Sequence, residues 1–216
     1  MSGIESRLAA LRWRYTPVMA RRNYPKGAAK REEILDVALE TVAENGYNAA
    51  TIRTIADAAG LSKTGVGHHF ASKHELLTAV LARRDESGVE ATHDAGVDLI
   101  FEVIREVLAR NAKDTGLTEL YIRLAAEATD PQNVAHQFFV DRYERLETFG
   151  IAELAELQRA GGVPRDMDLR VLSVLISSVV DGLQLRLLYD STLDPEPIVD
   201  ALRELLATAA KAAPHS

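Results

Sequence analysis

A pattern of hydroxyls and cations between residues 51 and 73 could bind the phosphates and bases of a nucleic acid. Thr51 and Ser62 each precede residues with helical spacing, where a hydroxyl can cap the free amides of the first turn. Arg53, Lys63 and Lys73 each lie one or two residues after a predicted helix start. Free amides and a cation at such a start suit a phosphate. Taken singly, the hydroxyls would be only caps and the lysines only solvated, so the combined pattern carries the prediction.

Short helices must position these side chains. Apolar residues recur with helical spacing through this region, and Ser72 to Glu75 form a capping box that opens a fourth helix. The predicted helix starts are residue 28, Thr51, Ser62 and Ser72, and the predicted ends of the first three helices are Glu44, Gly60 and Phe70. Asn45 and Gly46 stop the first helix, and Gly60 turns the chain after the second. Two short helices joined by a tight glycine turn predict a helix-turn-helix unit.

The segment from Thr51 to Leu77 resembles the DNA-binding signature of the TetR family of transcriptional regulators. The shared features are a capped helix, a glycine turn, a Ser-Lys pair opening the next helix, a Phe, and then Ser-Lys-x-Glu-Leu-Leu. The matching residues are Thr51, Ile55, Ala56, Gly60, Ser62, Lys63, His68, His69, Phe70, Ser72, Lys73, Glu75, Leu76 and Leu77. With the preceding helix, the resemblance covers about residues 28–88 without a gap, which makes it more specific than a lone short motif.

The geometry of a helix-turn-helix predicts a role for each polar residue, because the second of its helices enters the major groove by its N-terminal end. There, Lys63 can donate to guanine and the methyl group of Thr64 can meet that of thymine. Val66 and Phe70 are predicted core. The predicted DNA contacts are Thr51, Arg53, Ser62, Lys63, Thr64, Gly65, Gly67, His68, His69 and Lys73. His68 and His69 are adjacent and face different ways, so no metal site is predicted.

Gly67 departs from the family pattern, which usually has a bulky residue, commonly Tyr, at this position. Gly65 lies two residues earlier, and each glycine weakens a short helix by about 1 kcal/mol. Two explanations stay open. Either this helix becomes ordered only on DNA, or the bare backbone at Gly67 lies close to a base or a phosphate.

Charge is unevenly distributed along the 216 residues, whose net charge is −7. Residues 1–84 carry a net +5 and residues 85–216 a net −12, which is typical of a nucleic-acid-binding head on an acidic body, although chance clustering gives the same numbers. The absence of cysteine excludes disulfides and thiolate metal sites. The longest apolar stretch, Val171 to Val180, is short and broken by serines, and no secretory signal is evident. A soluble, cytoplasmic protein without a membrane partner is predicted.

The fold class predicted is all-α, with an N-terminal three-helix helix-turn-helix head and a C-terminal helical bundle for ligand binding and dimerisation. Residues 1–26 are basic and contain two prolines, so they predict a flexible arm that enters a minor groove or makes nonspecific phosphate contacts. Met19 within this arm is an alternative start. Residues 27–88 are the predicted DNA-binding domain, and residues 89–216 the predicted effector-binding and dimerisation domain.

A helix over about residues 168–188 is apolar nearly all round and must therefore be covered on more than one side. Asp130 followed by Pro131 predicts the start of a preceding long helix, and Asp194 followed by Pro195 the start of the last one. The family resemblance implies that the last two helices of each subunit form a homodimer interface. A symmetric dimer places two DNA-binding heads on the duplex, so the DNA site is predicted to be a palindrome or near-palindrome. The predicted interface residues are Leu172, Leu175, Val179, Gly182, Leu183, Leu202 and Leu205.

The resemblance also implies a pocket for an unidentified small-molecule effector between about residues 90 and 190. The predicted effector-binding residues are Tyr121, Arg123, Glu127, His136, Phe138, Tyr143 and Gln184. No cofactor is predicted. Two alternatives stay open: a DNA-binding dimer without an effector, and an all-α enzyme. The enzyme is disfavoured because Glu90 and His93 form only one of the two Glu-x-x-His pairs that a di-iron bundle needs, and no catalytic motif is present.

Overall fold

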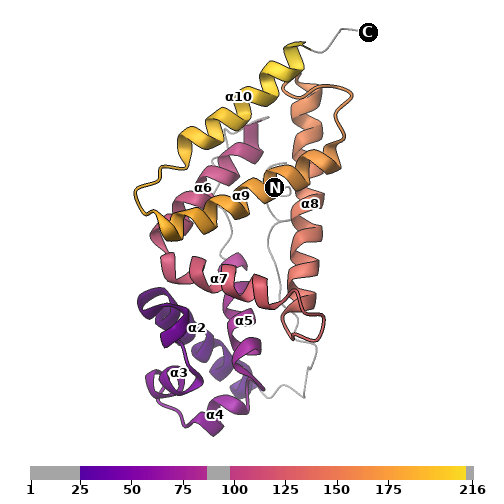
Figure 1. The fold of residues 1–216 in the computed structure, drawn as a ribbon. Coiled ribbons are helices and arrows are strands. Elements are labelled where there is room, and N and C mark those ends of the chain that lie inside the picture. The colour runs from indigo at the N-terminus through magenta and orange to yellow at the C-terminus, as the bar shows by residue number, and fades with distance from the viewer. Residues whose placement is uncertain (1–24, 87–97, 213–216) are drawn as a thin grey trace. The chain divides into compact units, whose positions relative to one another are not determined.

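The computed structural model describes residues 25–86 and 98–212, and these ranges contain helices and no strand (Figure 1). The predicted all-α fold is therefore confirmed. The predicted arm and the Glu90–His93 pair lie outside the described residues. The helices are α2 (Pro25–Ala49), α3 (Ile52–Ala58), α4 (Lys63–Gly67), α5 (Lys73–Glu86), α6 (Leu99–Lys113), α7 (Thr115–Glu127), α8 (His136–Arg159), α9 (Leu169–Tyr189) and α10 (Glu196–Ala212).

The described residues form two compact units. The N-terminal unit contains residues 25–86 and 114–140, and the C-terminal unit contains residues 98–113 and 141–212. Packing therefore groups α7 with the helix-turn-helix, whereas the sequence-based division placed every residue after 88 in the second domain. The functional division at residue 88 stays a prediction.

The core of the N-terminal unit combines the inner face of α2 with that of α7. Ile34, Ala38 and Val42 of α2 are completely buried, as is Leu120 of α7. Gly116 allows this close packing, because a Cβ atom there would collide with the carbonyl oxygen of Val42. The helix α2, which supports the helix-turn-helix, therefore packs against α7, a helix that begins more than sixty residues further along the sequence.

The predicted helix stops are confirmed where glycine takes a left-handed conformation. Gly46 has φ 75° and breaks the regular geometry of α2, and Gly60 has φ 65° after α3. The helix α4 ends at Gly67, three residues before the predicted end at Phe70.

The predicted start of the long helix at Asp130 and Pro131 is wrong, because α8 begins at His136. The carboxylate of Asp130 accepts a hydrogen bond from the Gln132 amide at 2.9 Å, and the side chain of Asn133 accepts one from the Ala135 amide at 2.9 Å. Two successive turns of this kind satisfy the backbone locally and so compete with helix formation.

The core of the C-terminal unit is formed mainly by α6, α8, α9 and α10. Asp168 caps α9 by accepting from the amides of Arg170 and Val171, and α9 covers the helix predicted over about residues 168–188. By length and composition alone α9 could cross a membrane, since it extends well beyond the apolar stretch from Val171 to Val180. One face of this helix lies in the protein core, where Leu172 and Ile176 are buried and Gln184 accepts a hydrogen bond from Asn111 at 2.9 Å.

Candidate nucleic-acid interface

Thr51 begins α3 with the cap that the sequence predicts. Its hydroxyl accepts from the Thr54 amide at 3.1 Å, and the Thr54 hydroxyl accepts from the Thr51 amide at 2.9 Å. This reciprocal pair fixes the first turn and leaves Arg53 at the surface, with 87% of its side chain exposed and only a 3.9 Å pairing with Asp57. An exposed guanidinium beside a helix start is suited to a phosphate.

Ser62 caps α4 by accepting from the Gly65 amide at 3.0 Å. Lys63 and Thr64 are exposed on the first turn, whereas Val66 and Phe70 are buried. The prediction that these two apolar residues belong to the core is therefore confirmed. The short helix buries one face and presents a cation and a hydroxyl on the other, which is the arrangement that reads base edges.

Neither glycine of α4 is required by the backbone or by packing. Both have φ outside the left-handed region, and a Cβ atom at Gly67 would meet nothing within 4 Å. At Gly65 it would lie 3.4 Å from the Ser62 hydroxyl, which is ordinary van der Waals contact. The bare backbone at Gly67 is available for a close approach, and its role at DNA stays a prediction.

His68 is exposed and His69 is half-buried at the end of this unit. Partial burial lowers the pKa of His69 below its ordinary value, and the charges of Arg31, His68 and Lys30 lower it further. Arg31 in turn stacks on the ring of Phe70, 4.4 Å from its centroid. No group of three or more potential metal ligands occurs among the residues that the structure describes.

Ser72 and Glu75 form the predicted capping box at the start of α5, with one difference. The Ser72 hydroxyl accepts from the Glu75 amide at 3.0 Å, but the Glu75 carboxylate accepts from the Ala71 amide, at 2.7 Å, rather than from that of Ser72. This cap sets the position of Lys73 in the first turn.

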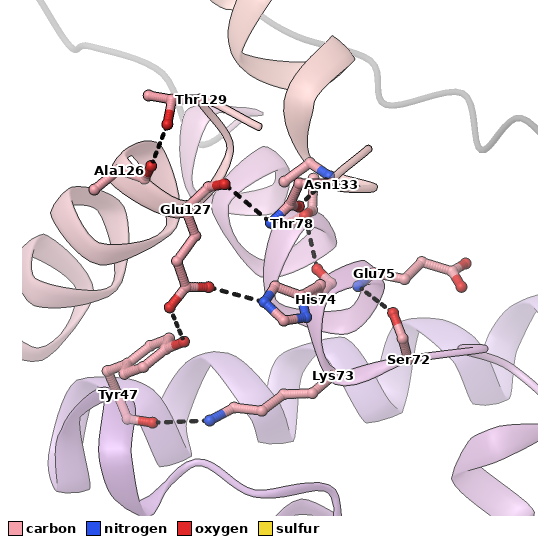
Figure 2. A network of polar contacts seen from close by, with 11 residues as sticks. Tyr47, Ser72, Lys73, His74, Glu75, Thr78, Ala126, Glu127, Thr129 and Asn133 are labelled. Carbon is pink, nitrogen blue, oxygen red and sulfur yellow. Dashed lines mark hydrogen bonds and ion pairs between the residues drawn. The ribbon is translucent and has the colours of Figure 1, made fainter. Parts of the chain in front are cut away.

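Lys73 contacts an aromatic residue that sequence reasoning missed. Its ammonium lies 4.4 Å from the ring centroid of Tyr47 and 3.5 Å from the Tyr47 carbonyl oxygen (Figure 2). The Tyr47 hydroxyl donates to Glu127 of α7 at 3.0 Å, and the other carboxylate oxygen of Glu127 lies 2.8 Å from Nε2 of His74. The one local signal for Tyr47 was an aromatic residue directly after the stop at Gly46.

The predicted effector-binding residues are divided between the two units. Arg123 stacks on Tyr47 at 5.4 Å, and Glu127 belongs to the network just described. Tyr121 and Phe138 are buried in the core of the N-terminal unit, and His136 Nδ1 lies 2.8 Å from the Ala128 carbonyl oxygen. Tyr143 and Gln184 belong to the C-terminal unit. All seven assignments stay predictions.

A cavity of about 530 Å³ lies in the C-terminal unit between α6 and the start of α10. Leu108, Ala109 and Val199 provide apolar lining, and Glu106 and Glu196 are acidic. None of the predicted effector-binding residues lines this cavity.

The predicted interface residues divide between the core and the surface. Leu172 and Leu183 are only 2% and 6% exposed, because they pack inside the chain's own core, so they are not available to a partner. Leu175 and Leu205 are 52% and 69% exposed, Gly182 is also exposed, and Val179 and Leu202 are half-buried.

Comparison with known families gives two matches that together span most of the chain. Residues 34–80 match the family described as "Bacterial regulatory proteins, tetR family". Residues 97–211 match the family described as "BetI-type transcriptional repressor, C-terminal". The first match contains the capped helices of the candidate interface, and the second contains α6 to α10 almost entirely.

The chain is also similar to named repressors over most of its length. It is 31% identical to the HTH-type transcriptional repressor AcnR of Corynebacterium diphtheriae over 181 residues, covering 81% of this chain and 90% of that protein. An HTH-type transcriptional repressor of Mycobacterium tuberculosis is 33% identical over 161 residues, covering 74% of this chain and 83% of that protein.

Solved structures share the fold at lower sequence identity. A transcriptional regulator from Rhodococcus is 23% identical, with a TM-score of 0.63, over 85% of this chain and 99% of that one. The regulator FadR of Bacillus subtilis, solved in complex with stearoyl-CoA, is 20% identical, with a TM-score of 0.61, over 82% of this chain and 97% of that one. These likenesses support the arrangement of the helices.

Proposed function

The chain belongs to the TetR family of bacterial transcriptional regulators, and from that premise we propose a repressor that binds a near-palindromic operator as a dimer and releases it when a small molecule binds. The observation that carries the proposal is α4. This helix has a capped start, exposes Lys63 and Thr64 and buries Val66, as a DNA-recognition helix requires. We infer a cytoplasmic location from this proposed function, because bacterial DNA lies in the cytoplasm.

The DNA contacts are divided by chemistry. Lys63 and Thr64 contact base edges, while Arg53 and Lys73 bind phosphates on either side. Thr51 and Ser62 add helix-start amides that their own hydroxyls hold in place. His68, His69 and the bare backbone at Gly65 and Gly67 complete the surface that faces the DNA.

The dimer is supported by an apolar stripe along α9. Val171, Leu175, Leu185 and Tyr189 are 61%, 52%, 42% and 86% exposed, and their spacing places them on one helix face with Gly182. An exposed apolar stripe of this length marks a protein interface. We therefore assign the partner-facing surface to these residues and to Leu205 of α10, with Val179 and Leu202 at its edge. A symmetric dimer presents two reading heads to two half-sites.

Release by a small molecule is supported by the family and by the cavity in the C-terminal unit. The FadR neighbour was solved with an acyl-CoA, which shows that this fold can hold a large ligand. A ligand that prefers one conformation of the body lowers operator affinity by a coupling of about 1–3 kcal/mol. A dimer that binds DNA without any effector would show no such coupling.

The test is a fluorescence-anisotropy titration of the wild type, Lys63→Ala and Lys73→Ala against the intergenic DNA beside the protein's own gene, at two salt concentrations. We expect tight binding to one near-palindrome. Lys63→Ala should lose about 1–3 kcal/mol of discrimination at one base position, and Lys73→Ala should weaken binding on all sequences alike.

The matched control is Lys113→Ala, which removes the same charge from an exposed site in the C-terminal unit. Weak binding that is indifferent to sequence, and equal in wild type and Lys63→Ala on every duplex tested, would reject the assignment of α4 as the reading helix.

A further inference from the structure

We propose that Tyr47 positions Lys73 for a DNA phosphate, and that Glu127 of α7 holds Tyr47 in place for this task. Tyr47 is then a positioning residue, and it acts on DNA through the ammonium of Lys73. The inference rests on the proposed DNA-binding function and identifies the point at which a helix outside the helix-turn-helix reaches a DNA contact.

The first step is the geometry around Lys73. Its ammonium is held by the face of the Tyr47 ring at 4.4 Å and by the Tyr47 carbonyl oxygen at 3.5 Å (Figure 2). A free lysine has many rotamers and loses this freedom when it binds a phosphate. A lysine already stacked on a ring has lost part of this freedom, because the face of the ring attracts the cation.

The second step is the hold on Tyr47. Its hydroxyl donates to Glu127 at 3.0 Å, and the second oxygen of the same carboxylate lies 2.8 Å from His74, the residue after Lys73. Burial and the neighbouring Glu127 carboxylate raise the pKa of Tyr47, so the phenol stays a donor at neutral pH. The Glu127 carboxylate therefore contacts both Tyr47, which stacks on Lys73, and His74, which follows Lys73 in the sequence.

The third step is the support of Glu127 itself. Its backbone carbonyl accepts from the Asn133 side chain at 3.3 Å, which fixes the end of α7 (Figure 2). Burial raises the pKa of Glu127, but the hydrogen bonds from His74 and Tyr47 outweigh this effect and lower it, so the carboxylate is charged. Because the side chains of His74 and Glu127 are 42% and 41% exposed, their pairing adds little to stability. The position of this pair beside Lys73 is better explained by a role in DNA binding.

The experiment is a double-mutant cycle between Tyr47→Leu and Lys73→Ala, with Tyr47→Phe as the conservative variant. The probes are a labelled duplex of the intergenic DNA and a random-sequence duplex at low salt, since a phosphate contact is independent of sequence. Lys73→Ala should lower affinity about fivefold and reduce the slope of log affinity against log salt by about 0.9, the value expected for one phosphate.

Tyr47→Leu should lower affinity about two- to fivefold, the fold-change that corresponds to removing one cation–π interaction near the protein surface. It should have no further effect once Lys73 is alanine. Tyr47→Phe keeps the ring and should recover most of the affinity. Glu127→Ala should weaken DNA binding only when Lys73 is present. Urea unfolding of every variant separates a loss of fold from a loss of positioning.

The two possible failures are distinguishable. If Lys73→Ala leaves the affinity and the salt slope unchanged on both duplexes, the proposed phosphate contact is wrong. If Lys73→Ala weakens binding but the effects of Tyr47→Leu and Lys73→Ala simply add, the DNA-binding function stands and the positioning role of Tyr47 is overturned.

Discussion

The surface around α4 and the outer face of α9 are both exposed to solvent, but the side chains that they expose differ in polarity. Around α4 the apolar side chains of Val66 and Phe70 are buried, and the exposed groups are hydroxyls and cations. Along α9 the exposed groups include Val171, Leu175 and Tyr189, all large and apolar. The first surface is fully hydrated without a partner, whereas the second leaves apolar area in water.

The difference indicates how each surface finds its partner. A polar surface binds DNA through charge, so its affinity for DNA falls as the salt concentration rises. Such binding is readily reversed. An apolar stripe associates through the hydrophobic effect, so its partner should be bound before and after DNA binding. The proposed repressor thus keeps its dimer permanently and changes only its contact with the operator.

The largest expected effect is on the apolar side of this comparison. Leu175→Glu places a charge within the proposed stripe, where the dimer would bury it without a partner. The expected cost to the dimer is roughly 3–5 kcal/mol, enough to give monomers at micromolar concentration in sedimentation equilibrium. Ala160→Glu, at an exposed position near the end of α8, is the control. A Leu175→Glu protein that remains dimeric would assign the interface to another face.

The next effect is on the cap of α4. Ser62→Ala leaves the Gly65 amide without the acceptor that now lies 3.0 Å away, and it should lower the free energy of unfolding by about 1 kcal/mol. Operator affinity should fall as well, because this turn carries Lys63. Urea unfolding and anisotropy measure the two quantities, and Ser191→Ala on an exposed turn serves as the comparison. Unchanged values of both would show that the cap is dispensable.

A smaller effect, of opposite sign on stability and on binding, is expected at Gly67. Its Cβ position is open and its φ is not left-handed, so Gly67→Ala should raise the free energy of unfolding by about 0.5–1 kcal/mol. If the bare backbone contacts DNA, the same change should weaken operator binding. Gly60→Ala is the contrasting variant, since φ 65° at Gly60 makes a side chain costly. Wild-type operator affinity in Gly67→Ala would remove Gly67 from the interface.

The sequence was sufficient for features decided within a few residues. Thr51, Ser62 and Ser72 cap helices through neighbours three residues away, so the starts of α3, α4 and α5 could be predicted, although the end of α4 was placed three residues too late. The start of α8 was mispredicted by the same local reasoning, because Asp130 followed by Pro131 suits both a helix start and a turn. The side chain of Asn133, three residues after Asp130, accepts a hydrogen bond from the Ala135 amide and so stabilises a turn instead of a helix.

Contacts between distant segments could not be predicted. Tyr47 and Glu127 are separated by 80 positions, and nothing near either residue indicates the other. Along α9, apolar residues occur on every side, so spacing alone does not separate the inward Leu172 from the outward Leu175. Which face of α9 is buried depends on the helices that pack against it in the core of the C-terminal unit.

The smallest expected effect is a pH dependence at His69, which lies on the polar side of the comparison. Because its pKa is below the ordinary 6.5, the unfolded chain binds a proton first as pH falls, so the contribution of His69 to stability is lost from about pH 6.5 downward. A nearby phosphate acts in the opposite direction, since it raises the pKa of His69 and binding then takes up a proton. Operator affinity should therefore rise between pH 8 and about pH 6, and less steeply in His69→Asn. Equal slopes in the two proteins would mean that His69 is crowded by Arg31 and Lys30 but does not reach the DNA.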